Sequence, residues 1–450
     1  MKIVESKQDL ELFLGPIESD KFLVIPVLSD HIKHGYINRL CLLYVNDFNG
    51  NEAILSYDHD ELNSLDPTCH QMLIDKINNS NIFLLDKKTN MFMFPETRIL
   101  YDIELIEYIK YGEVKTDFNI KTSAHRLIYK NFHSLEGVNS YIPLVKHIEY
   151  FDIVKEKAIK TITDNYDIIN DVSYGVMNNI QVSFFGVMEA NGIFVNDKYK
   201  NRKVVHNNLI YPRYNFYTKT GRPTCNVNGL NFLSMNKNDG SRSIFETRFG
   251  KSGKLLLVDY KSRHLYLIAE MIKEKFTENP HTYFGKIYLN KDELTQEEYD
   301  ESKKITYQIL YGGVPKEFEK IPFFGKIKKL MNELHNAYNN DGFLITPLYK
   351  RKLYKSQLGD LKKQKLFNYY FQAVETEYGT SALKHIIEYL SKYRSRCILY
   401  VYDSFLFDFN VLDGTEVFND LISIVSENNK FPVSIEVGKN YNDLEEVFIK

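Results

Sequence analysis

The stretch ILYVYDSFLFDF, residues 398–409, has the composition of a buried β-hairpin, because nine of its twelve residues are apolar or aromatic. Asp403 and Ser404 stand in its middle, where two strands would turn. Burying an unpaired carboxylate is costly, so an acid at this place needs a partner. Asp403 is therefore a turn residue, the partner of a neighbouring lysine, or the ligand of a cation.

A second apolar strand also ends in an acid. LLLVDY (255–260) carries Asp259 near its end. Two carboxylates at the ends of adjacent strands can hold a pair of Mg²⁺ ions about 3.5–4 Å apart, the arrangement used for phosphoryl and nucleotidyl transfer. Mg²⁺ prefers one or two carboxylates plus substrate phosphates. Asp259 and Asp403 together therefore predict a two-metal site.

The segment TQEEYDESKKITYQILYGG (295–313) predicts a helix, with Thr295 as its cap and Gly-Gly at its end. Lys303, Tyr307 and Tyr311 follow at intervals of four residues, which places them on one face. A cation on that face can meet phosphates, and the aromatic rings can stack on a base. An amphipathic helix with two core tyrosines and a solvated lysine has the same pattern, so the spacing alone does not decide.

Length and composition set broad limits. The 450 residues suffice for about two or three domains. A formal net charge of -2 neither proves nor excludes a nucleic-acid partner. Four cysteines without a CxxC pair argue against a zinc site and fit a reducing compartment. No apolar run is long enough to span a membrane, so we expect no membrane span and no membrane partner. The expected location is the cytoplasm.

Strands and helices alternate irregularly along the chain, which predicts an α+β fold rather than repeated βαβ units. Strands are expected at 21–28, 38–46, 255–260, in the hairpin 398–409 and at 432–437. Helices are expected at 101–111, from about 144 to 191, at 295–313, 325–340 and 362–393, and near 414–428.

The motifs, taken in their order and spacing, resemble those of a family A DNA polymerase of the bacterial polymerase I type. VDYKSRHLYLIA (258–269) resembles the first palm motif, KKITYQILYGG (303–313) the fingers-helix motif, and VYDS (401–404) the third motif, a hairpin. TGRPTCNVNGLNF (220–232) is similar to the primer-template segment of that family. NYYFQAVETEYG (368–379) keeps an Asn and a Gln four apart, like the family's minor-groove readers.

The resemblance implies a right-hand polymerase palm and fingers with a reduced thumb, preceded by an α/β exonuclease-like domain, in a phage or viral enzyme of the host cytoplasm. The implied domains are a degenerate 3′–5′ exonuclease-like domain at 1–155, the reduced thumb base and first part of the palm at 156–270, the fingers at 271–360, and the rest of the palm at 361–450. The implied partners are primer-template DNA, dNTPs and a processivity or replisome protein.

The resemblance also implies roles for individual residues. Asp259 and Asp403 would bind two Mg²⁺ ions, for which Mn²⁺ can substitute, and Lys303 would join them as a catalytic residue. The dNTP would contact His264, His281, Lys303, Tyr307 and Tyr311. The primer-template would contact Arg222, Asn368 and Gln372.

Several positions depart from the family pattern. The Arg expected four residues before Lys303 is Tyr299, so one triphosphate contact is missing, and His281 and Lys304 are candidates to replace it. The acid expected after Asp403 is Ser404, with Tyr402 in place of a His. His264 stands where the family carries a Glu that helps to block a ribose 2′-OH. Imidazole is nearly as large as that carboxylate side chain, so we expect dNTPs to be preferred over rNTPs.

Two further departures concern DNA binding and proofreading. The family inserts a long thumb where this chain has only about twenty residues, 197–220, so we expect it to hold DNA weakly by itself. The family's exonuclease needs an Asp-x-Glu on its first strand, and here Pro26 and Leu28 fall at about those places. Asp86, Asp102 and Asp152 could derive from later exonuclease motifs but do not make a site. An unrelated α/β platform that binds a partner is the alternative for this region.

Four basic clusters could meet nucleic acid or could be ordinary solvated faces. They are KSRH (261–264), KIKK (326–329), YKRKLYK (349–355) and KKQK (362–365).

Two other functions remain open at the level of the sequence. Single-subunit RNA polymerases share this palm and also read Asp-Ser-Phe in the third motif, as at 403–405, but no promoter-recognition domain is evident. A structural replisome subunit that kept the fold is the non-enzymatic alternative. The presence of Asp259, Lys303, Tyr311 and Asp403 argues against it.

Overall fold

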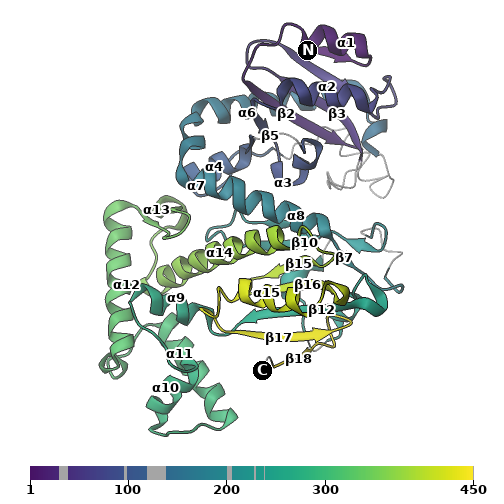
Figure 1. Ribbon diagram of the computed structural model, residues 1–450. Coiled ribbons are helices and arrows are strands. Elements are labelled where there is room, and N and C mark those ends of the chain that lie inside the picture. Colours follow the sequence, from purple (N-terminus) through teal and green to yellow (C-terminus); the bar gives the residue numbers. More distant parts are fainter. Residues whose placement is uncertain are drawn as a thin grey trace. The chain divides into compact units, whose positions relative to one another are not determined.

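The computed structural model describes residues 1–29, 39–95, 99–118, 138–199, 205–227, 230–237 and 239–448. The chain divides into two compact units, Met1–Ala190 and Asn191–Lys450, coloured from purple to teal and from teal to yellow in Figure 1. The boundary predicted at 155 falls inside α6 (Leu144–Asp164), a helix that continues across that position. The finer division into 156–270, 271–360 and 361–450 stays a prediction.

The first unit is built on a six-stranded mixed sheet with the order β1-β4-β3-β2-β5-β6. Its strands are β1 (Lys2–Val4), β2 (Lys21–Leu28), β3 (Leu40–Asn46), β4 (Glu52–Ser56), β5 (Asn81–Leu84) and β6 (Leu100–Asp102). Its helices are α1 (Lys7–Leu14), α2 (Pro67–Ile77), α3 (Lys87–Asn90), α4 (Ile103–Tyr111), α6 and α7 (Val172–Val176), followed by a π-helical segment (Met177–Val182) and α8 (Ser183–Asn191). The predicted strand at 21–28 is confirmed as β2, and that at 38–46 is β3, whose expected start at 38 lies outside the described residues.

Strand β3 shows why this part of the sequence is so apolar. Leu43 and Val45 belong to a core that includes side chains of α1 and α2. Tyr44 points to the other face, where its ring stacks on Phe151 of α6 with 5.6 Å between the ring centroids. Because successive strand residues face opposite sides, a strand covered on both sides needs an almost continuous apolar run.

The second unit is built on a five-stranded antiparallel sheet with the order β15-β16-β12-β17-β18. Its strands are β12 (Gly253–Tyr260), β15 (Arg396–Val401), β16 (Ser404–Asn410), β17 (Val433–Gly438) and β18 (Glu445–Glu446). The hairpin predicted at 398–409 is confirmed as β15 and β16, and the strand predicted at 255–260 is the end of β12. Shorter strands in this unit are β7 (Ile193–Phe194), β8 (Leu209–Ile210), β9 (Tyr214–Asn215), β10 (Thr224–Val227), β11 (Leu230–Asn231), β13 (Phe343–Ile345) and β14 (Lys352–Tyr354).

Helices cover this sheet and extend beyond one end of it (Figure 1). They are α9 (Arg263–Met271), α10 (Pro280–Leu289), α11 (Gln296–Gly312), α12 (Pro322–Asp341), α13 (Lys355–Leu358), α14 (Lys363–Leu390) and α15 (Thr415–Val425). The long helix α14 packs against β15 and also against α9, α11, α12 and α15, so it connects the sheet with the helices beyond it. The predicted α+β fold class is confirmed.

Local signals set the ends of α11. Thr295 and Glu298 form a capping box, in which each side chain bonds the other's backbone N–H. At the other end, the backbone N–H of Gly313 donates to the carbonyl of Ile309, and Gly313 has a φ of 105° that favours glycine. The predicted start and end of this helix are therefore confirmed. None of the described helices is both long and apolar enough to cross a membrane.

Candidate active site

The two acids lie side by side at one end of the central sheet. Asp259 of β12 is directly opposite Ser404 of β16 in the antiparallel register. Asp403 occupies the preceding turn, and its carbonyl accepts a 3.0 Å hydrogen bond from the N–H of Tyr260. The prediction that both carboxylates stand at the ends of adjacent strands is confirmed by this register.

Burial and the charges of nearby carboxylates oppose ionisation of both acids. Burial, followed by the charges of Asp403 and Glu436, raises the pKa of Asp259 to about 7, while Lys303 acts in the opposite direction. Burial, and then the charge of Glu375, also raises the pKa of Asp403. Within the described part of the chain neither acid forms an ion pair with a lysine, arginine or histidine. The alternative in which each acid pairs with a neighbouring lysine is therefore wrong.

This donor set fits hard divalent cations. It offers two carboxylates whose repulsion a positive ion would relieve. The described residues hold no group of three or more His, Cys, Asp or Glu side chains placed to bind a metal. A cation at Asp259 and Asp403 would thus need further oxygen ligands from a substrate or water, which is the coordination that Mg²⁺ prefers.

A cleft of about 840 Å³ opens beside the two acids. Lys303, Tyr307 and Tyr311 of α11 contribute to its lining, which confirms that these side chains share one face. Its lining also includes Arg222, Asp259, Arg263, His264, Asn368, Gln372, Glu375 and Asp403. Every residue predicted for the site lies in this lining except His281, and Lys304 is also outside it.

The aromatic residues of α11 form a stack along the cleft. The rings of Tyr307 and Tyr311 are parallel within 2°, with centroids 5.8 Å apart. Lys303, one turn earlier, is exposed, and its charge is felt by Asp259. The helix therefore presents one cation and two stacked rings opposite the carboxylates.

His264 and Tyr311 form the pair that the family resemblance predicts. The Nδ1 atom of His264, on α9, is 2.6 Å from the hydroxyl oxygen of Tyr311. The other ring nitrogen, Nε2, is 3.1 Å from a carboxylate oxygen of Glu375 on α14. The imidazole is thus held between two side chains from two other helices.

Glu375 is the site residue that sequence reasoning missed. It is only 3% exposed. Burial opposes its ionisation, but His264, Arg222 and Arg263 together hold the pKa of its carboxyl below the usual value. The available signal was its spacing: Glu375 follows Gln372 by three residues and Asn368 by seven, which places all three on one helical face.

The side chain of Arg222 packs against the hairpin turn beside Asp403. Its guanidinium lies 3.9 Å from the ring centroid of Tyr402, and one of its nitrogens is 3.6 Å from Glu375. Tyr402 has a φ of 55°, a left-handed conformation that is uncommon for a tyrosine. The cation–π contact accounts for part of what holds the ring in this position.

The structure places His281 away from the cleft, contrary to the predicted direct contact with a dNTP. Its side chain is fully buried beside the rings of Tyr299 and Tyr307, at centroid distances of 6.0 and 5.3 Å. Neither ring nitrogen has a hydrogen-bond partner among the described residues. Burial, and then the charge of Lys303, lowers the pKa of His281 to about 4. His281 supports the tyrosines from behind as a neutral ring.

This buried histidine should make the protein less stable in mild acid. In the unfolded chain its pKa is close to 6.5, so it binds a proton below that pH, whereas in the folded chain it stays neutral down to about pH 4. Stability is therefore lost as the pH falls through this window, by about 1–3 kcal/mol. We expect His281→Leu to lose less thermal stability than the wild type between about pH 7.5 and about pH 5.

The matched control is His385→Leu, which removes a histidine that is 62% exposed. Its loss of stability over the same pH range should equal that of the wild type. If His281→Leu and the wild type lost the same amount, the buried neutral state of His281 would be refuted.

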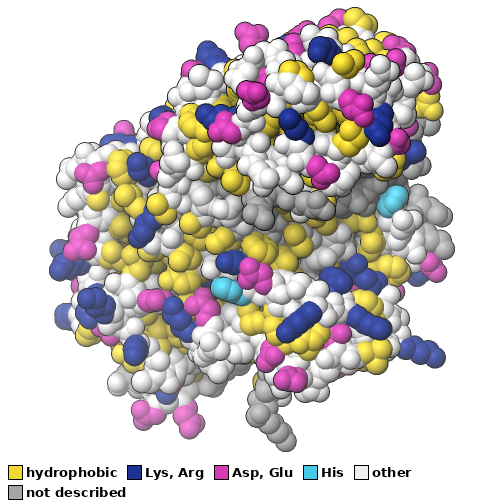
Figure 2. Space-filling view, turned by 45° about the horizontal axis from the view of Figure 1, so that its top comes forward, with side chains coloured by type: hydrophobic (Ala, Val, Ile, Leu, Met, Phe, Trp, Pro, Cys, Tyr) yellow, Lys and Arg dark blue, Asp and Glu magenta, His cyan; other side chains and the backbone are white. Residues whose placement is uncertain are grey.

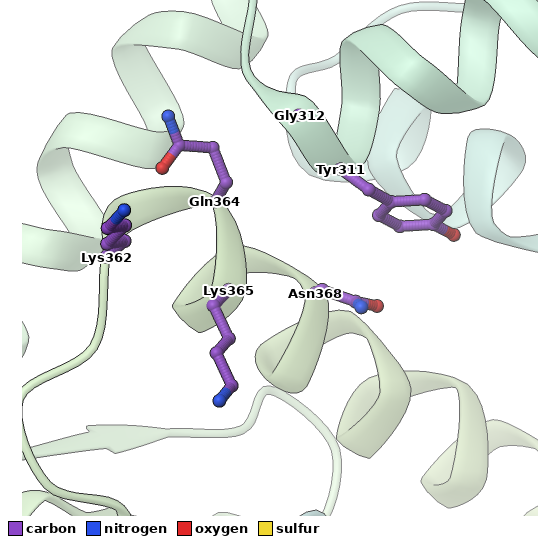
Figure 3. A pocket seen from close by; sticks show the side chains of 6 residues that line it. All are labelled: Tyr311, Gly312, Lys362, Gln364, Lys365 and Asn368. Carbon is purple, nitrogen blue, oxygen red and sulfur yellow. The ribbon is translucent and has the colours of Figure 1, made fainter.

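A smaller pocket of about 400 Å³ adjoins the cleft. It lies between the end of α11, with Tyr311 and Gly312, and the start of α14, with Lys362, Gln364, Lys365 and Asn368. Figure 3 shows the side chains of Tyr311 and Asn368 extending to the same side, whereas the two lysines extend elsewhere. The predicted basic cluster KKQK (362–365) thus stands beside the cleft.

The cluster KIKK (326–329) has a different environment. Its lysines pair with acids: Lys326 with Glu274, Lys328 with Glu319 and Lys329 with Glu333. In YKRKLYK (349–355), Arg351 is buried and donates to the carbonyl of Thr220. On the face seen in Figure 2, Lys and Arg side chains are interspersed with Asp and Glu. The lysines of KIKK therefore form a solvated face paired with acids, and Arg351 of the second cluster serves the interior rather than a cationic surface.

Comparisons with known proteins show a likeness of fold. No protein-family model matches the chain, and no curated protein matches it. Among solved structures, the chain is similar to the POL domain of Pol1 from M. smegmatis in complex with DNA primer-template and dNTP. The TM-score is 0.70, with 98% of this chain and 99% of that one covered, at 14% sequence identity. The fold is therefore that of a DNA polymerase domain.

Proposed function

We propose that this protein is a template-directed DNA polymerase of the family A type, which adds dNTPs to a primer 3′ end. One observation carries the proposal: the carboxylates of Asp259 and Asp403 share a cleft with Lys303 and the stacked Tyr307 and Tyr311. Carboxylates for metal ions, a cation for phosphates and rings for a base are what nucleotidyl transfer requires. The likeness of fold to a DNA polymerase domain supports it.

Asp259 and Asp403 are the residues that would hold two Mg²⁺ ions, for which Mn²⁺ can substitute. When bound, such ions stabilise the charge on the attacking and leaving oxygens and make the primer 3′-OH a better nucleophile. Burial and the charges of nearby carboxylates disfavour the ionised forms of Asp259 and Asp403. Bound cations would offset this cost.

The remaining side chains bind and orient the substrates. Lys303 attracts the triphosphate and the departing pyrophosphate, because its ammonium group is exposed in the cleft. Tyr307 packs against sugar and base, and the His264–Tyr311 pair closes the pocket beside the sugar. Arg222, Asn368 and Gln372 would contact the minor-groove acceptors that all base pairs share, which permits binding without sequence preference.

Primer extension tests the proposal directly. A primed template should be extended with dNTPs, only in the presence of Mg²⁺ or Mn²⁺, and less well with rNTPs. Extension that favours rNTPs would identify an RNA polymerase or primase-like enzyme instead. A protein that binds primed DNA but extends it with neither nucleotide would be a structural subunit.

We further propose that a processivity or replisome protein assists the enzyme. The segment between Asp197 and Thr220 is short where the resembling family inserts a thumb. Fewer phosphate contacts weaken binding to DNA. A partner that holds the duplex would compensate for them.

We expect no proofreading by the first unit. Pro26 and Leu28 lie in β2, where an exonuclease would carry its acids. Asp102 caps α4 by accepting from the N–H of Leu105, and Asp152 pairs with Lys155, so both already serve the fold. A mismatched primer incubated with Mg²⁺ and without dNTPs should therefore stay at full length.

A proofreading polymerase on the same primer serves as the positive control. Shortening of the primer that is lost in Asp259→Asn would belong to the polymerase site and would leave the expectation for the first unit intact. Retention of the shortening in Asp259→Asn would assign it to the first unit and would refute the expectation.

A further inference from the structure

The negative charge next to the His264–Tyr311 pair comes from Glu375 on α14. Position 264 itself carries no acid, but a carboxylate oxygen of Glu375 on α14 lies 3.1 Å from His264 Nε2, an ion-pair distance without the geometry of a hydrogen bond. His264 Nδ1 lies in turn 2.6 Å from the hydroxyl of Tyr311. Three helices, α14, α9 and α11, thus contribute one side chain each to a chain of close polar contacts that ends in the cleft.

The contacts constrain the hydrogen-bonding role of each imidazole nitrogen, because Nε2 faces a carboxylate and Nδ1 faces a hydroxyl that can either donate or accept. A carboxylate beside Nε2 favours the form of His264 that carries a proton on that nitrogen. In the neutral ring, Nδ1 is then an acceptor and the Tyr311 hydroxyl donates to it, whereas in the doubly protonated ring Nδ1 donates to that hydroxyl. In both forms Tyr311 keeps a partner as long as the proton stays on Nε2. Without the charge at 375, the ring could turn or take the other tautomer, and Tyr311 would lose a fixed partner.

Cations around Glu375 keep this arrangement in place. Arg222 approaches it to 3.6 Å. Arg263 is 2% exposed, its guanidinium lies 3.7 Å from the ring centroid of Tyr260, and its nitrogens have no hydrogen-bond partner among the described residues. It therefore acts on Glu375 as a charge rather than through a hydrogen bond. A buried carboxylate with this surrounding stays ionised and stays in position.

We propose that Glu375 is a positioning residue for sugar selection, which holds His264 so that Tyr311 keeps its place at the sugar side of the cleft. The proposal rests on the proposed polymerase function. The resembling family carries a Glu at the position of His264. In this protein the negative charge would come from Glu375 on α14, and the histidine would be held in place by it. Discrimination against a ribose 2′-OH then depends on a residue that does not itself contact the nucleotide.

Glu377 provides a matched control on the same helix. It is 2% exposed, lies 3.8 Å from Arg351 and accepts a 3.0 Å hydrogen bond from the N–H of Tyr349. It is not part of the cleft lining. Glu375→Gln and Glu377→Gln therefore make the same chemical change at two buried sites, of which only one adjoins His264.

The experiment compares single-nucleotide insertion of a matched dNTP and rNTP. We expect Glu375→Gln to lower the dNTP preference roughly tenfold, mainly by raising KM for the dNTP and lowering it for the rNTP, the size of one charge-assisted contact. Glu377→Gln should leave the preference unchanged. Equilibrium binding of both nucleotides to a complex with a dideoxy-terminated primer should show the same shift without turnover.

A double variant tests whether Glu375 acts through His264. His264→Ala should reduce the preference by itself, and adding Glu375→Gln should change it no further, because residues that act in series are not additive. Glu375→Asp, which keeps the charge on a shorter side chain, should retain part of the preference. If Glu375→Gln does not fold, Glu375→Asp should still show a preference between those of the wild type and His264→Ala, and a preference equal to that of the wild type would count against the role of Glu375.

Each failure has a separate meaning. If the wild-type protein extended no primer, the proposed function would be wrong. If it did extend primers, an unchanged preference in folded Glu375→Gln, or independent effects in the double variant, would overturn the role of Glu375 alone. An equal change in Glu377→Gln would reduce that role to general stability.

Discussion

Asp403→Asn and Asp259→Asn should each lower primer extension by about three orders of magnitude or more. Each variant removes one charge from a pair of carboxylates that face no lysine, arginine or histidine in an ion pair within the described residues. The loss of a metal ligand costs several kcal/mol of transition-state stabilisation, and about 1.4 kcal/mol corresponds to a tenfold change in rate. Single-turnover extension with saturating dNTP measures the effect.

The same variants should fold at least as well as the wild type. The raised pKa of Asp259 shows that the charged form is disfavoured there, so the neutral amide relieves repulsion. Asp360→Asn, at a side chain that is 91% exposed, is the matched control and should extend primers normally. Extension by Asp259→Asn or Asp403→Asn at close to the wild-type rate would show that the metal site is wrongly assigned.

Lys303→Ala should reduce the extension rate by roughly a hundredfold. The lysine is the cation of α11 in the cleft lining, and the expected partner, the triphosphate, gains negative charge as pyrophosphate leaves. Removing one donor from such charge stabilisation costs about 10²–10³ in rate. Because the contact is expected to strengthen in the transition state, kcat should fall more than KM rises.

Lys304→Ala is the control for this prediction. It removes the same charge from the next residue of α11, which is exposed but lies outside the cleft lining. The charge of the whole protein changes equally in both variants, so a general electrostatic effect on DNA binding would affect both. Equal losses in the two variants would mean that Lys303 has no specific contact with the triphosphate.

Features with local causes could be read from the sequence. Thr295 and Glu298 set the start of α11, and the two glycines set its end. At each end the hydrogen-bonding partners are only three or four residues apart in the sequence. The turn at Asp403 follows from two apolar runs that flank it. The meeting of these two elements in one cleft is not a local property. It was predicted only from the resemblance of several motifs in the same order.

Features set by distant contacts could not be read in this way. His281 is buried because α10 packs on α11, where the hydroxyl of Ser302 donates to its carbonyl at 2.6 Å. The lysines of KIKK find Glu274 and Glu319 on other segments. The spacing of Glu375 from Asn368 and Gln372 marks its helical face, but its partner His264 lies on another helix. In each case the deciding neighbour lies outside the window in which a sequence pattern is read.

Helix α14 carries both the residues proposed to contact the duplex and the residue proposed to position His264. Asn368 and Gln372, proposed to touch the duplex, and Glu375, which holds His264, lie on one face of a helix of 28 residues. Seven residues of α-helix span about 10 Å, and such a length moves as a stiff rod. In the proposed function, one helix would therefore place the contacts to the duplex and the residue that positions His264 at a fixed spacing from one another.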